Sequence, residues 1–411
     1  MLLNVNVEDI IDGLRKASNV VPAKSGAVYL RALWLSADSD YLTIMSTDTA
    51  LEFTGKYPAA ISDSGLAGIN GKQFTDLMNR MRGGTITLKL EDGNALSIEK
   101  GKKIKYALPV SDVTWFQKLE EFPRENAVQW SGDFLSDAIN KTLFSVDDEG
   151  NEDAISCLYM GVNGPKENQT IDICGLNGHQ FAIYHFIHDS LASIMPEGGI
   201  LIQKKYVNEL LRWLPKNDIE VSITSKRLFI STGDESECLS IPRTLLTYPN
   251  YNTFMSRLDT PDFSLLTINK QELKEALERL SVFCVDGRRF AIFNLSENEL
   301  SLSVYGQNDA KGVETIEINY NSPIKKIGFP VKDVIAILDH FESDEVSFKM
   351  TPNDGPCGIT GKDDPDYEVL IMPMRSMDDD YYEDDDEEEE EEYESDDSED
   401  DSDSHDDSDN E

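Results

Sequence analysis

The segments FTDLMNRM (residues 74–81), VNELLRWL (residues 207–214) and VIAILDHF (residues 334–341) share one pattern of apolar side chains. In each, apolar residues stand at positions i, i+3, i+4 and i+7, which fall on one face of an α-helix. Successive segments are about 130 residues apart. The pattern therefore predicts three consecutive units of similar plan, each containing this amphipathic helix.

A second helical pattern precedes each of these segments, by 67, 72 and 61 residues in chain order. Its apolar positions are Val7, Ile10, Ile11 and Leu14, then Leu135, Ala138 and Ile139, then Leu273, Ala276, Leu277 and Leu280. Thr142 interrupts the middle pattern. Each unit is thus expected to contribute two helices.

Between and after the helices the apolar period changes to two, in residues 86–99, 219–232 and 299–320. Such alternation, with Asp92-Gly93 as a turn in the first segment, predicts antiparallel hairpins. A sheet with one apolar face needs a cover, which two helices per unit supply. We therefore expect an α+β protein whose three tandem domains span residues 1–125, 126–256 and 257–376.

Charge separates the end of the chain from the rest. Residues 377–411 hold 24 of the 78 acidic residues and no lysine or arginine, which leaves 54 acidic and 37 basic residues in the remainder. This tail has too few apolar residues to bury a core, so we expect it to be disordered. The acidic total argues against a protein that coats nucleic acid generally, but it does not exclude a local basic surface.

The N-terminal sequence MLLNVNVEDIIDG has no basic flank, and no stretch of about 18 apolar residues follows. We therefore expect a cytoplasmic protein that makes no contact with a membrane. Five cysteines without a CxxC pair predict neither a metal site nor a disulfide framework, and are interpreted as small buried apolar residues.

One lysine recurs at the same register of the second helix: Lys72, Lys205 and Lys332 each stand two residues before the first apolar position. Two residues correspond to about 200° of helix rotation, so each lysine is expected to point away from the core. Further basic residues on the same helices are Arg80, Lys141, Lys204, Arg212, Lys274 and Arg279. A repeated basic face suits a phosphate backbone bound without sequence reading, and an ordinary solvated helix face is the alternative.

Motifs for catalysis and metal binding are not found. GLAGINGKQF (residues 65–74) fails as a phosphate loop because Leu66 and Gln73 replace the required glycine and hydroxyl residue. His185 and His188 would point to opposite faces of a strand, and the acidic segment around Asp147 is interpreted as a solvated turn. We therefore expect a protein that is not an enzyme and has no cofactor and no metal.

Several ordered segments carry a resemblance to one family. They are GLNGHQFAIY (175–184), ILIQKKYVNELLRWL (200–214), YPNYNTF (248–254), IGFPVKDVIAILDHF (327–341) and the sequence Met-Pro-Met-Arg at 372–375. On a triplicated chain and in this order, they resemble the bacterial sliding clamp, the beta subunit of DNA polymerase III, over residues 1–376. The resemblance implies the DNA clamp fold, with one chain forming half of a closed ring and two chains joined head to tail as a homodimer.

In such a ring the helices line the hole and the sheets form the outside, so duplex DNA meets the basic helix faces. The resemblance implies that the DNA-facing residues are Lys24, Lys72, Arg80, Lys141, Lys204, Lys205, Lys274 and Lys332. Loose contacts to phosphate let the ring slide on double-stranded DNA without sequence specificity. The implied function is a processivity factor that tethers the replicative polymerase to nucleoid DNA.

The resemblance also implies an apolar groove between the second and third domains that binds short peptide motifs. The expected partners are the DNA polymerase III catalytic subunit, the clamp loader, other polymerases and repair proteins. Carried over by position, the groove would use Leu158, Leu176, Gly178, His179, Phe181, Pro249, Phe254, Leu370, Ile371, Met372, Pro373, Met374 and Arg375. Leu158 depends on which of two registers the strand AISCLYMGV adopts, and the alternative for VLIMPM is a final core strand.

The chain departs from the family pattern at three rim positions. Gln180 stands where arginine is common, Asn177 replaces aspartate, and Thr253 falls where a basic residue is frequent. The acidic tail is a further departure, for which a solubilising role without specific contacts is the alternative to an effect on DNA or partners. The homodimer interface is expected around Tyr106 and Leu108 in the first domain and Val282 and Phe283 in the third.

Two other classes of function compete with the clamp. The acidic tail taken alone suggests a histone-binding or nucleoplasmin-like chaperone, or another binding protein. A hydrolase with a scattered active site is the third class. The chaperone interpretation leaves the triplicated helices unexplained, so the clamp is favoured.

Overall fold

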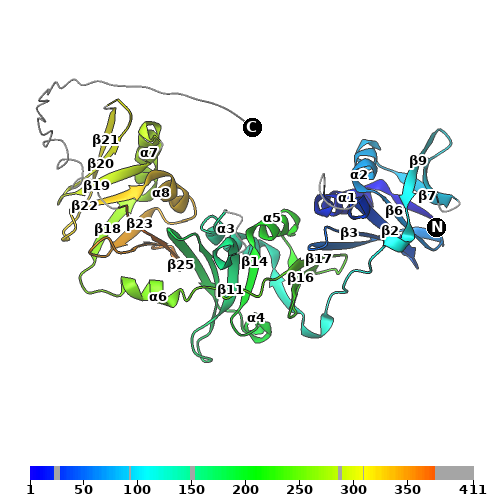
Figure 1. Cartoon of the computed structure of the whole chain (residues 1–411), viewed down its shortest axis with the longest axis horizontal. Helices are drawn as coiled ribbons and strands as arrows, with labels where there is room; N and C mark the ends of the chain where they lie inside the picture. The colour runs from blue at the N-terminus through cyan, green and yellow to red at the C-terminus, as the bar shows by residue number, and fades with distance from the viewer. Residues whose placement is uncertain (23–27, 92–93, 149–152, 286–288, 309, 375–411) are drawn as a thin grey trace, which may run out of the picture. The chain divides into compact units, whose positions relative to one another are not determined.

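The computed structural model describes residues 1–22, 28–91, 94–148, 153–285, 289–308 and 310–374 (Figure 1). Its element order repeats three times, with a strand and a helix followed by strands, a second helix and a final three strands. The predicted α+β class is confirmed. Lys24, Arg375, the Asp92-Gly93 turn and the acidic tail lie outside the described residues.

The first unit contains two helices and nine strands in the described part of residues 1–125. Its helices and strands are β1 (Leu2–Asn6), α1 (Val7–Val20), β2 (Ala32–Asp38), β3 (Tyr41–Thr47), β4 (Glu52–Pro58), β5 (Ala60–Asp63), β6 (Gly65–Asn70), α2 (Gly71–Arg80), β7 (Thr85–Glu91), β8 (Ala95–Lys100) and β9 (Ile104–Ser111). The 3₁₀ turn η1 (Val28–Arg31) precedes β2, and η2 (Val113–Trp115) follows β9.

The second unit repeats this order with one extra short helix, α4, that the apolar periodicity did not predict. Its elements are η3 (Arg124–Asn126), β10 (Val128–Ser131), α3 (Gly132–Leu143), η4 (Ala154–Ser156), β11 (Cys157–Asn163), β12 (Thr170–Leu176), β13 (Gln180–Phe186), α4 (Asp189–Ile194), β14 (Ile200–Gln203), α5 (Lys204–Trp213), β15 (Asp218–Ile223), β16 (Arg227–Thr232) and β17 (Glu237–Pro242).

A short segment with two helical turns, also not predicted, leads to the third unit: α6 (Asn252–Met255) and η5 (Ser256–Leu258). The third unit then contains β18 (Ser264–Asn269), α7 (Lys270–Leu280), η6 (Ser281–Phe283), β19 (Phe290–Leu295), β20 (Glu299–Tyr305), β21 (Lys311–Glu317), β22 (Lys326–Pro330), α8 (Val331–Leu338), β23 (Glu345–Met350), β24 (Cys357–Gly361) and β25 (Asp364–Ile371).

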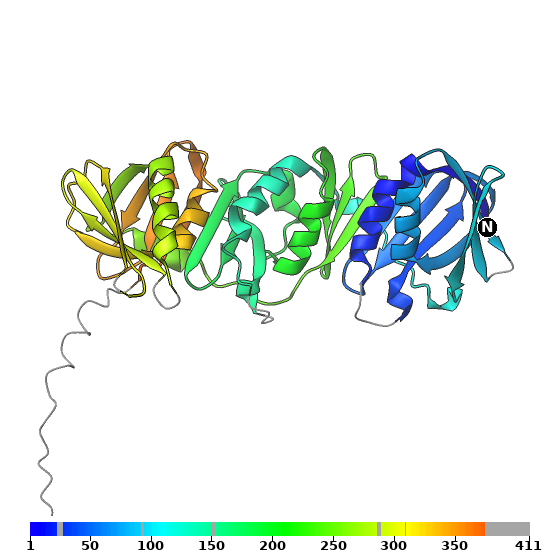
Figure 2. The same cartoon turned by 90° about the horizontal axis from the view of Figure 1, so that it is seen from above.

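The six predicted helices form, and each buries its apolar face. In α2, Phe74 and Met78 are fully buried, and α1 lies beside α2 (Figure 2). Thr142, which interrupts the pattern of α3, is also fully buried, because its hydroxyl group donates to the carbonyl oxygens of Ala138 and Ile139. A threonine thus replaces an apolar residue without leaving a buried donor unpaired.

Helix starts follow the capping preferences of the sequence. The side chain of Asn70 accepts a hydrogen bond from the Gln73 N–H at the start of α2, and Ser131 accepts from Phe134 at the start of α3. Asn269 does the same for α7, accepting from Glu272. These oxygen atoms pair backbone donors that have no partner within the helix.

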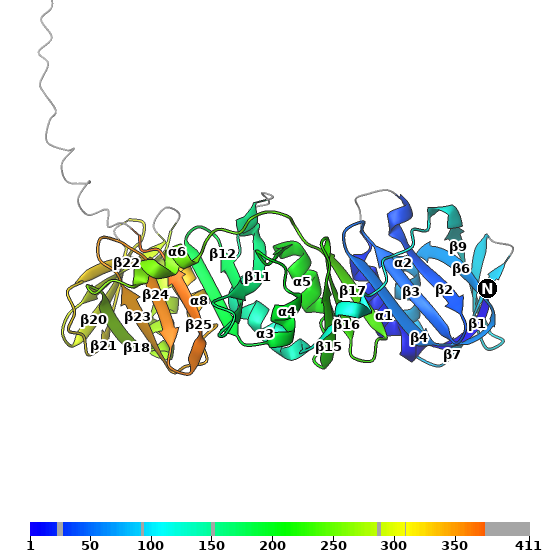
Figure 3. The ribbon, with the colours of Figure 1, turned by 90° about the horizontal axis from the view of Figure 1, so that it is seen from below.

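Two of the three sheets in the described ranges continue from one unit into the next, which the sequence did not predict. A sheet of 13 strands joins the first and second units where β4 pairs with β17, and a sheet of eight strands joins the second and third where β13 pairs with β25. Figure 3 shows β25 beside β24 in this second sheet. A third sheet, of four strands, has the order β21-β20-β19-β22.

The two junctions use equivalent strands. In each, the third strand after the first helix of one unit (β4 or β13) pairs antiparallel with the last strand of the following unit (β17 or β25). Glu52 at the start of β4 lies opposite Ser240, and Gln180 at the start of β13 lies opposite Ile371. The repeat in the sequence therefore becomes a repeat of strand pairing between units.

Three of the five cysteines, Cys157, Cys174 and Cys357, are buried, and the other two are half-buried. Burial raises the pKa of the Cys157 thiol to about 11, so this group stays protonated near neutral pH. The interpretation as buried apolar residues is confirmed for these three. Within the described ranges, no helix is both long and apolar enough to cross a bilayer.

Candidate functional site

An apolar groove of about 300 Å³ lies at the turn between β12 and β13, beside the end of β25. Its lining combines aliphatic, aromatic and methionine side chains with three polar ones. These residues are Leu176, Gly178, His179, Gln180, Phe181, Phe254, Arg257, Pro356, Leu370, Ile371 and Met372. A concave apolar surface with a few polar groups is typical of a binding site.

One wall of the groove is the turn between β12 and β13. The side-chain oxygen of Asn177 accepts hydrogen bonds from the N–H groups of His179 (3.1 Å) and Gln180 (2.8 Å). Gly178 has a φ of +85°, which favours glycine because a Cβ atom would strain the backbone there. The side chain of Asn177 thus supplies the acceptor that holds this turn.

The opposite wall is the end of β25. Phe181 lies opposite Leu370 in the strand pair, and the N–H of Met372 donates to the carbonyl oxygen of His179 (2.9 Å). Beyond it, the Met374 N–H donates to the carbonyl oxygen of Gly328 (2.9 Å) and ends the described chain on β22. The position of this wall is therefore set by backbone hydrogen bonds at Met372 and Met374.

The segment between β17 and β18 closes the floor. The ring of Tyr251 stacks on Phe181, with centroids 5.7 Å apart, and Phe254 meets Phe181 edge to face at 6.0 Å. The Tyr251 hydroxyl donates to the buried Asp172 carboxylate at 2.8 Å. Burial, reinforced by this carboxylate, raises the pKa of Tyr251, which keeps the phenol protonated as the donor.

Eight of the predicted groove residues lie together in this lining: Leu176, Gly178, His179, Phe181, Phe254, Leu370, Ile371 and Met372. Pro249, Pro373 and Met374 are not part of it, and Arg375 lies outside the described residues. Sequence reasoning missed Arg257 and Pro356 and named Gln180 only as a departure. Arg257 stands four residues, about one helical turn, after Thr253, the position at which the sequence lacks an expected basic residue. This spacing was the signal that could have identified Arg257 as a groove residue.

Leu158 requires a correction, because its side chain belongs to the other face of the sheet. It packs with Met160 in the large core that α3 and α5 cover, whereas Cys157 and Tyr159 belong to the cluster that holds Phe181 and Leu370. Successive side chains of a strand point to opposite faces, so one residue of register decides which side is reached. The register adopted by β11 turns Leu158 away from the groove.

The repeated lysines Lys72, Lys205 and Lys332 all have exposed side chains, as does Arg80. Each of the three lysines lies within the first two residues of its helix, α2, α5 or α8. The predicted outward orientation of these lysines is confirmed. Among the described residues none of the three has a carboxylate partner, so their charge is free to meet an anion.

Three other predicted DNA-facing lysines are held by partners inside the chain, and two of them lie on α5 and α7. Lys204 contacts the Val146 carbonyl oxygen (2.6 Å) and the Asp148 carboxylate (2.7 Å). The ammonium of Lys274 pairs with Asp339, and this hydrogen bond raises the pKa of Lys274. Much of the charge of these two lysines is therefore neutralised locally.

Lys141, the third, is the clearest revision among these residues. Its side chain is only 16 % exposed, and its ammonium contacts the buried Asp364 at 3.0 Å while lying over the rings of Tyr184 and Tyr367. Burial would raise the pKa of Asp364, but hydrogen bonds from Ser343, Lys141 and the Glu342 N–H lower it below its usual value. Lys141 therefore braces the junction of β13 and β25 instead of presenting a free charge.

Two of the open strand edges in the described chain belong to β21 and β9. β21 ends its sheet, and β9 pairs with β8 along its length but with β6 only at Val110 and Ser111. Exposed apolar side chains mark both regions, with Tyr106 45 %, Val313 51 % and Val282 82 % exposed. Of the other predicted interface residues, Leu108 is buried and Phe283 is half-buried.

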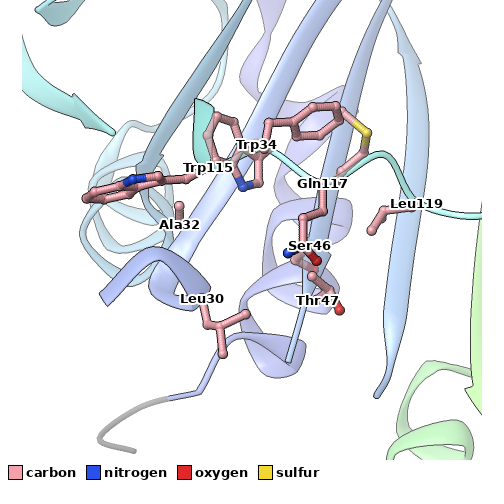
Figure 4. A pocket seen from close by; sticks show the side chains of 10 residues that line it. Leu30, Ala32, Trp34, Ser46, Thr47, Trp115, Gln117 and Leu119 are labelled. Carbon is pink, nitrogen blue, oxygen red and sulfur yellow. The ribbon is translucent and has the colours of Figure 1, made fainter. Parts of the chain in front are cut away.

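A further cavity lies on the sheet of the first unit, beside the segment that follows β9. Figure 4 shows Trp34, Trp115 and Leu30 among the side chains around it. Its volume of about 20 Å³ is close to the space that one water molecule needs. It is too small for a side chain of a partner, so the groove at β25 is the stronger candidate site.

Comparison with known families gives two matches on this chain. Residues 1–120 match the N-terminal domain of the DNA polymerase III beta subunit, and residues 261–375 match its C-terminal domain. Together these matches cover more than half of the 411 residues.

Relatives and solved structures extend over nearly the whole chain. The beta sliding clamps of Haemophilus influenzae and Rickettsia felis are each 23 % identical, over 91 % of this chain and 100 % and 99 % of their own. The pol III beta structure from Caulobacter crescentus superposes with a TM-score of 0.82 at 18 % identity, covering 92 % of this chain and all of its own. A Bartonella birtlesii sliding clamp bound to griselimycin gives 0.83 at 20 % identity with the same coverage.

Proposed function

Because the chain belongs to the DNA polymerase III beta subunit family, we propose that it is a DNA sliding clamp whose two copies close head to tail around duplex DNA. It is a non-catalytic processivity factor of DNA replication, as are the sliding clamps that it resembles.

The observation that carries the ring is the repeated strand junction. β4 of the first unit pairs with β17 of the second, and β13 of the second pairs with β25 of the third. β21 is the equivalent strand of the third unit, and in the described chain no strand of a further unit pairs with it. The first unit's last strand, β9, has the matching open edge. A second copy would supply each missing partner, since an exposed strand edge is a template for pairing.

Side chains at the two edges favour this pairing. Tyr106 on β9 and Val313 on β21 offer exposed apolar surface. Lys102 and Lys103 precede β9, and the exposed Glu317 lies on β21, where Glu314 is already paired with Arg279. Opposite charges would guide the head-to-tail orientation and disfavour pairing of two identical edges.

The DNA-binding part of the proposal rests on Lys72, Lys205 and Lys332. They occupy one register of α2, α5 and α8, and they have no carboxylate partner within the described chain. Few and exposed ammonium groups give weak contacts to phosphate that carry no sequence information. Such contacts permit a clamp to slide, whereas many tight contacts would hold it in place.

The groove is proposed as the docking site for polymerase, clamp-loader and repair-protein peptides. Its apolar walls would take hydrophobic side chains of an extended segment, and Met372 gives one wall a side chain that adapts to several shapes. As a factor bound to nucleoid DNA it would work in the cytoplasm. The acidic tail alone suggested a chaperone, and no contact among the described residues favours that function.

A topological experiment tests encirclement. The protein is loaded by a clamp loader on nicked circular DNA, and the DNA is then cut once with a restriction enzyme. We expect retention on the circle and rapid loss after cutting, because a ring leaves through a free end. Equal loss from circular and linear DNA would contradict the proposal.

A further inference from the structure

We propose that Gln180 sets the specificity of the groove, which accepts partner segments that present an uncharged N–H donor to the Gln180 side-chain oxygen. This inference rests on the proposed docking function of the groove.

Gln180 is a buried polar residue in an apolar site. Its side chain is 6 % exposed and lines the groove together with Leu176 and Ile371. The side-chain oxygen Oε1 is buried and has no hydrogen-bond donor in the described chain. Buried amide oxygens are nearly always paired, and this one belongs to a residue that lines the groove, so we take a bound ligand to be the source of its donor.

Two hydrogen bonds hold the backbone of Gln180 in this place. Its N–H donates to the Asn177 side chain at 2.8 Å, and its carbonyl oxygen accepts from the Asn177 N–H at 3.2 Å. Across the sheet the residue lies opposite Ile371. The backbone that carries this side chain is therefore already ordered, so a partner loses little free energy in ordering it.

The other strand junction shows how the equivalent position is satisfied. Glu52 begins β4 as Gln180 begins β13, and its carboxylate lies 3.7 Å from the Arg227 guanidinium. The N–H of Glu120, from the segment between the first two units, also donates to it, at 3.4 Å. Burial raises the pKa of Glu52 and Arg227 opposes that rise.

Arg227 itself is built into the first junction. It is buried, and it donates to the carbonyl oxygens of Ala50 (2.6 Å) and Ser240 (3.1 Å). At the second junction the residue at the start of the corresponding strand β24 is Cys357, which offers no comparable donor. At the first junction, N–H donors from the chain thus pair with Glu52. At the second junction, the side-chain oxygen of Gln180 is left for a ligand.

Charge selects the kind of donor. Glu52 is acidic and takes a cation, whereas Gln180 is neutral and would leave a buried cation without a counter-charge. Arg257 lines the same groove and would repel an ammonium or guanidinium group. An uncharged donor remains, namely a backbone N–H or the primary amide of asparagine or glutamine.

The test uses the full chain and peptides selected on it. A random heptapeptide display library is selected against the immobilised protein, and the tightest peptide is measured by fluorescence anisotropy on wild type, Gln180→Leu and Gln180→Met. Each donor of the peptide is then removed in turn, by N-methylation of backbone amides and by replacing asparagine or glutamine with leucine. Gln73→Leu, at an exposed position on α2, is the matched control.

We expect one removed donor to weaken binding to wild type and Gln73→Leu about tenfold, in line with one hydrogen bond to a buried group. The same removal should change binding to Gln180→Leu and Gln180→Met less than about twofold, because the acceptor is already gone. If every peptide derivative loses the same factor on wild type and on both Gln180 variants, the inference is overturned. Thermal unfolding identifies a variant that fails to fold, and the other variant then decides.

A second variant separates this outcome from failure of the docking function. Met372→Glu places a charge in the groove wall at a partly exposed position. Selected peptides that bind Met372→Glu as tightly as wild type do not occupy the groove, and the proposed docking function itself then fails. Some peptides could lose binding to Met372→Glu and yet lose the same factor on donor removal with wild type and with the Gln180 variants. Such peptides overturn only the donor preference.

Discussion

At the scale of single residues, buried polar side chains decide how the groove is held. Asp172 accepts hydrogen bonds from Tyr251, Asn163 and Thr170, each at 2.8 Å. The first of these joins the segment before the third unit to the sheet of the second. The floor of the groove therefore depends on a carboxylate that does not line it.

We predict that Tyr251→Phe lowers the free energy of unfolding by about 1.5–3 kcal/mol, the usual range for a hydrogen bond to a carboxylate. It should also weaken peptide binding, because the Tyr251 ring that stacks on Phe181 loses the hydrogen bond that holds it in place. Urea unfolding and anisotropy measure the two effects. Tyr41→Phe, at a side chain that is 50 % exposed, is the control and should change neither.

The Lys141–Asp364 pair gives a pH-dependent prediction. The pKa of Asp364 is lowered in the folded protein, so this group stabilises the fold above its unfolded value of about 4, and that contribution is lost as the pH falls through the lower folded value. Lys141→Met should therefore cost about 2 kcal/mol at neutral pH and clearly less at about pH 3. Urea midpoints of both proteins at the two pH values measure this. A cost that is the same at both would contradict the role given to Asp364.

At the scale of elements, two open strand edges and three helix faces carry the proposed assembly. β21 and β9 are the strands whose equivalents are paired at both internal junctions. The second helices α2, α5 and α8 each present one exposed lysine near their start. These features repeat with the unit and are therefore properties of the element, not of one residue.

We predict that Tyr106→Glu or Val313→Glu raises the dimer dissociation constant at least about tenfold, because each places a charge where apolar side chains would meet. Sedimentation velocity across a concentration series measures the constant. Leu245→Glu changes an 84 % exposed apolar residue away from both edges and is the control. Equal association of all four proteins would argue against pairing through these strands.

Substitution of Lys72, Lys205 and Lys332 by alanine should make DNA binding less sensitive to salt. Removing one phosphate contact reduces the slope of log K against log[salt] by about 0.9, so the slope of the triple variant should fall by up to about 3 per chain. Binding to short duplex DNA between about 50 and 300 mM salt measures the slope. Alanine at the exposed Lys166, Lys226 and Lys362 removes the same charge elsewhere and should leave the slope nearly unchanged.

At the scale of the whole molecule, the charge of the chain is unevenly divided. The last 35 residues hold 24 acidic residues and no lysine or arginine, and they begin a few residues after the groove wall at Leu370–Met372. In the proposed clamp, a tethered polyanion would compete with DNA for the lysines, and salt would screen this competition over about 10 Å at about 0.1 M.

We predict that removal of residues 377–411 increases DNA retention at about 50 mM salt and that the difference disappears by about 500 mM, where charges are screened. Retention on nicked circular DNA after loading is the measurement. Identical retention curves for the full and shortened chains would leave only a solubilising role for the tail. A tail replaced by a neutral glycine–serine segment of equal length separates charge from length.

The sequence by itself determined the six helices, the hairpins and the threefold repeat, because these depend on the local periodicity of apolar side chains. It also placed Lys72, Lys205 and Lys332 outside the cores and brought eight groove residues into one set, the latter through resemblance to a family. Only the tertiary structure decided that sheets continue between units, that β11 turns Leu158 to the other face, and that Lys141 is taken up by Asp364. Those facts depend on which distant residues meet, and a one-dimensional pattern does not contain that information.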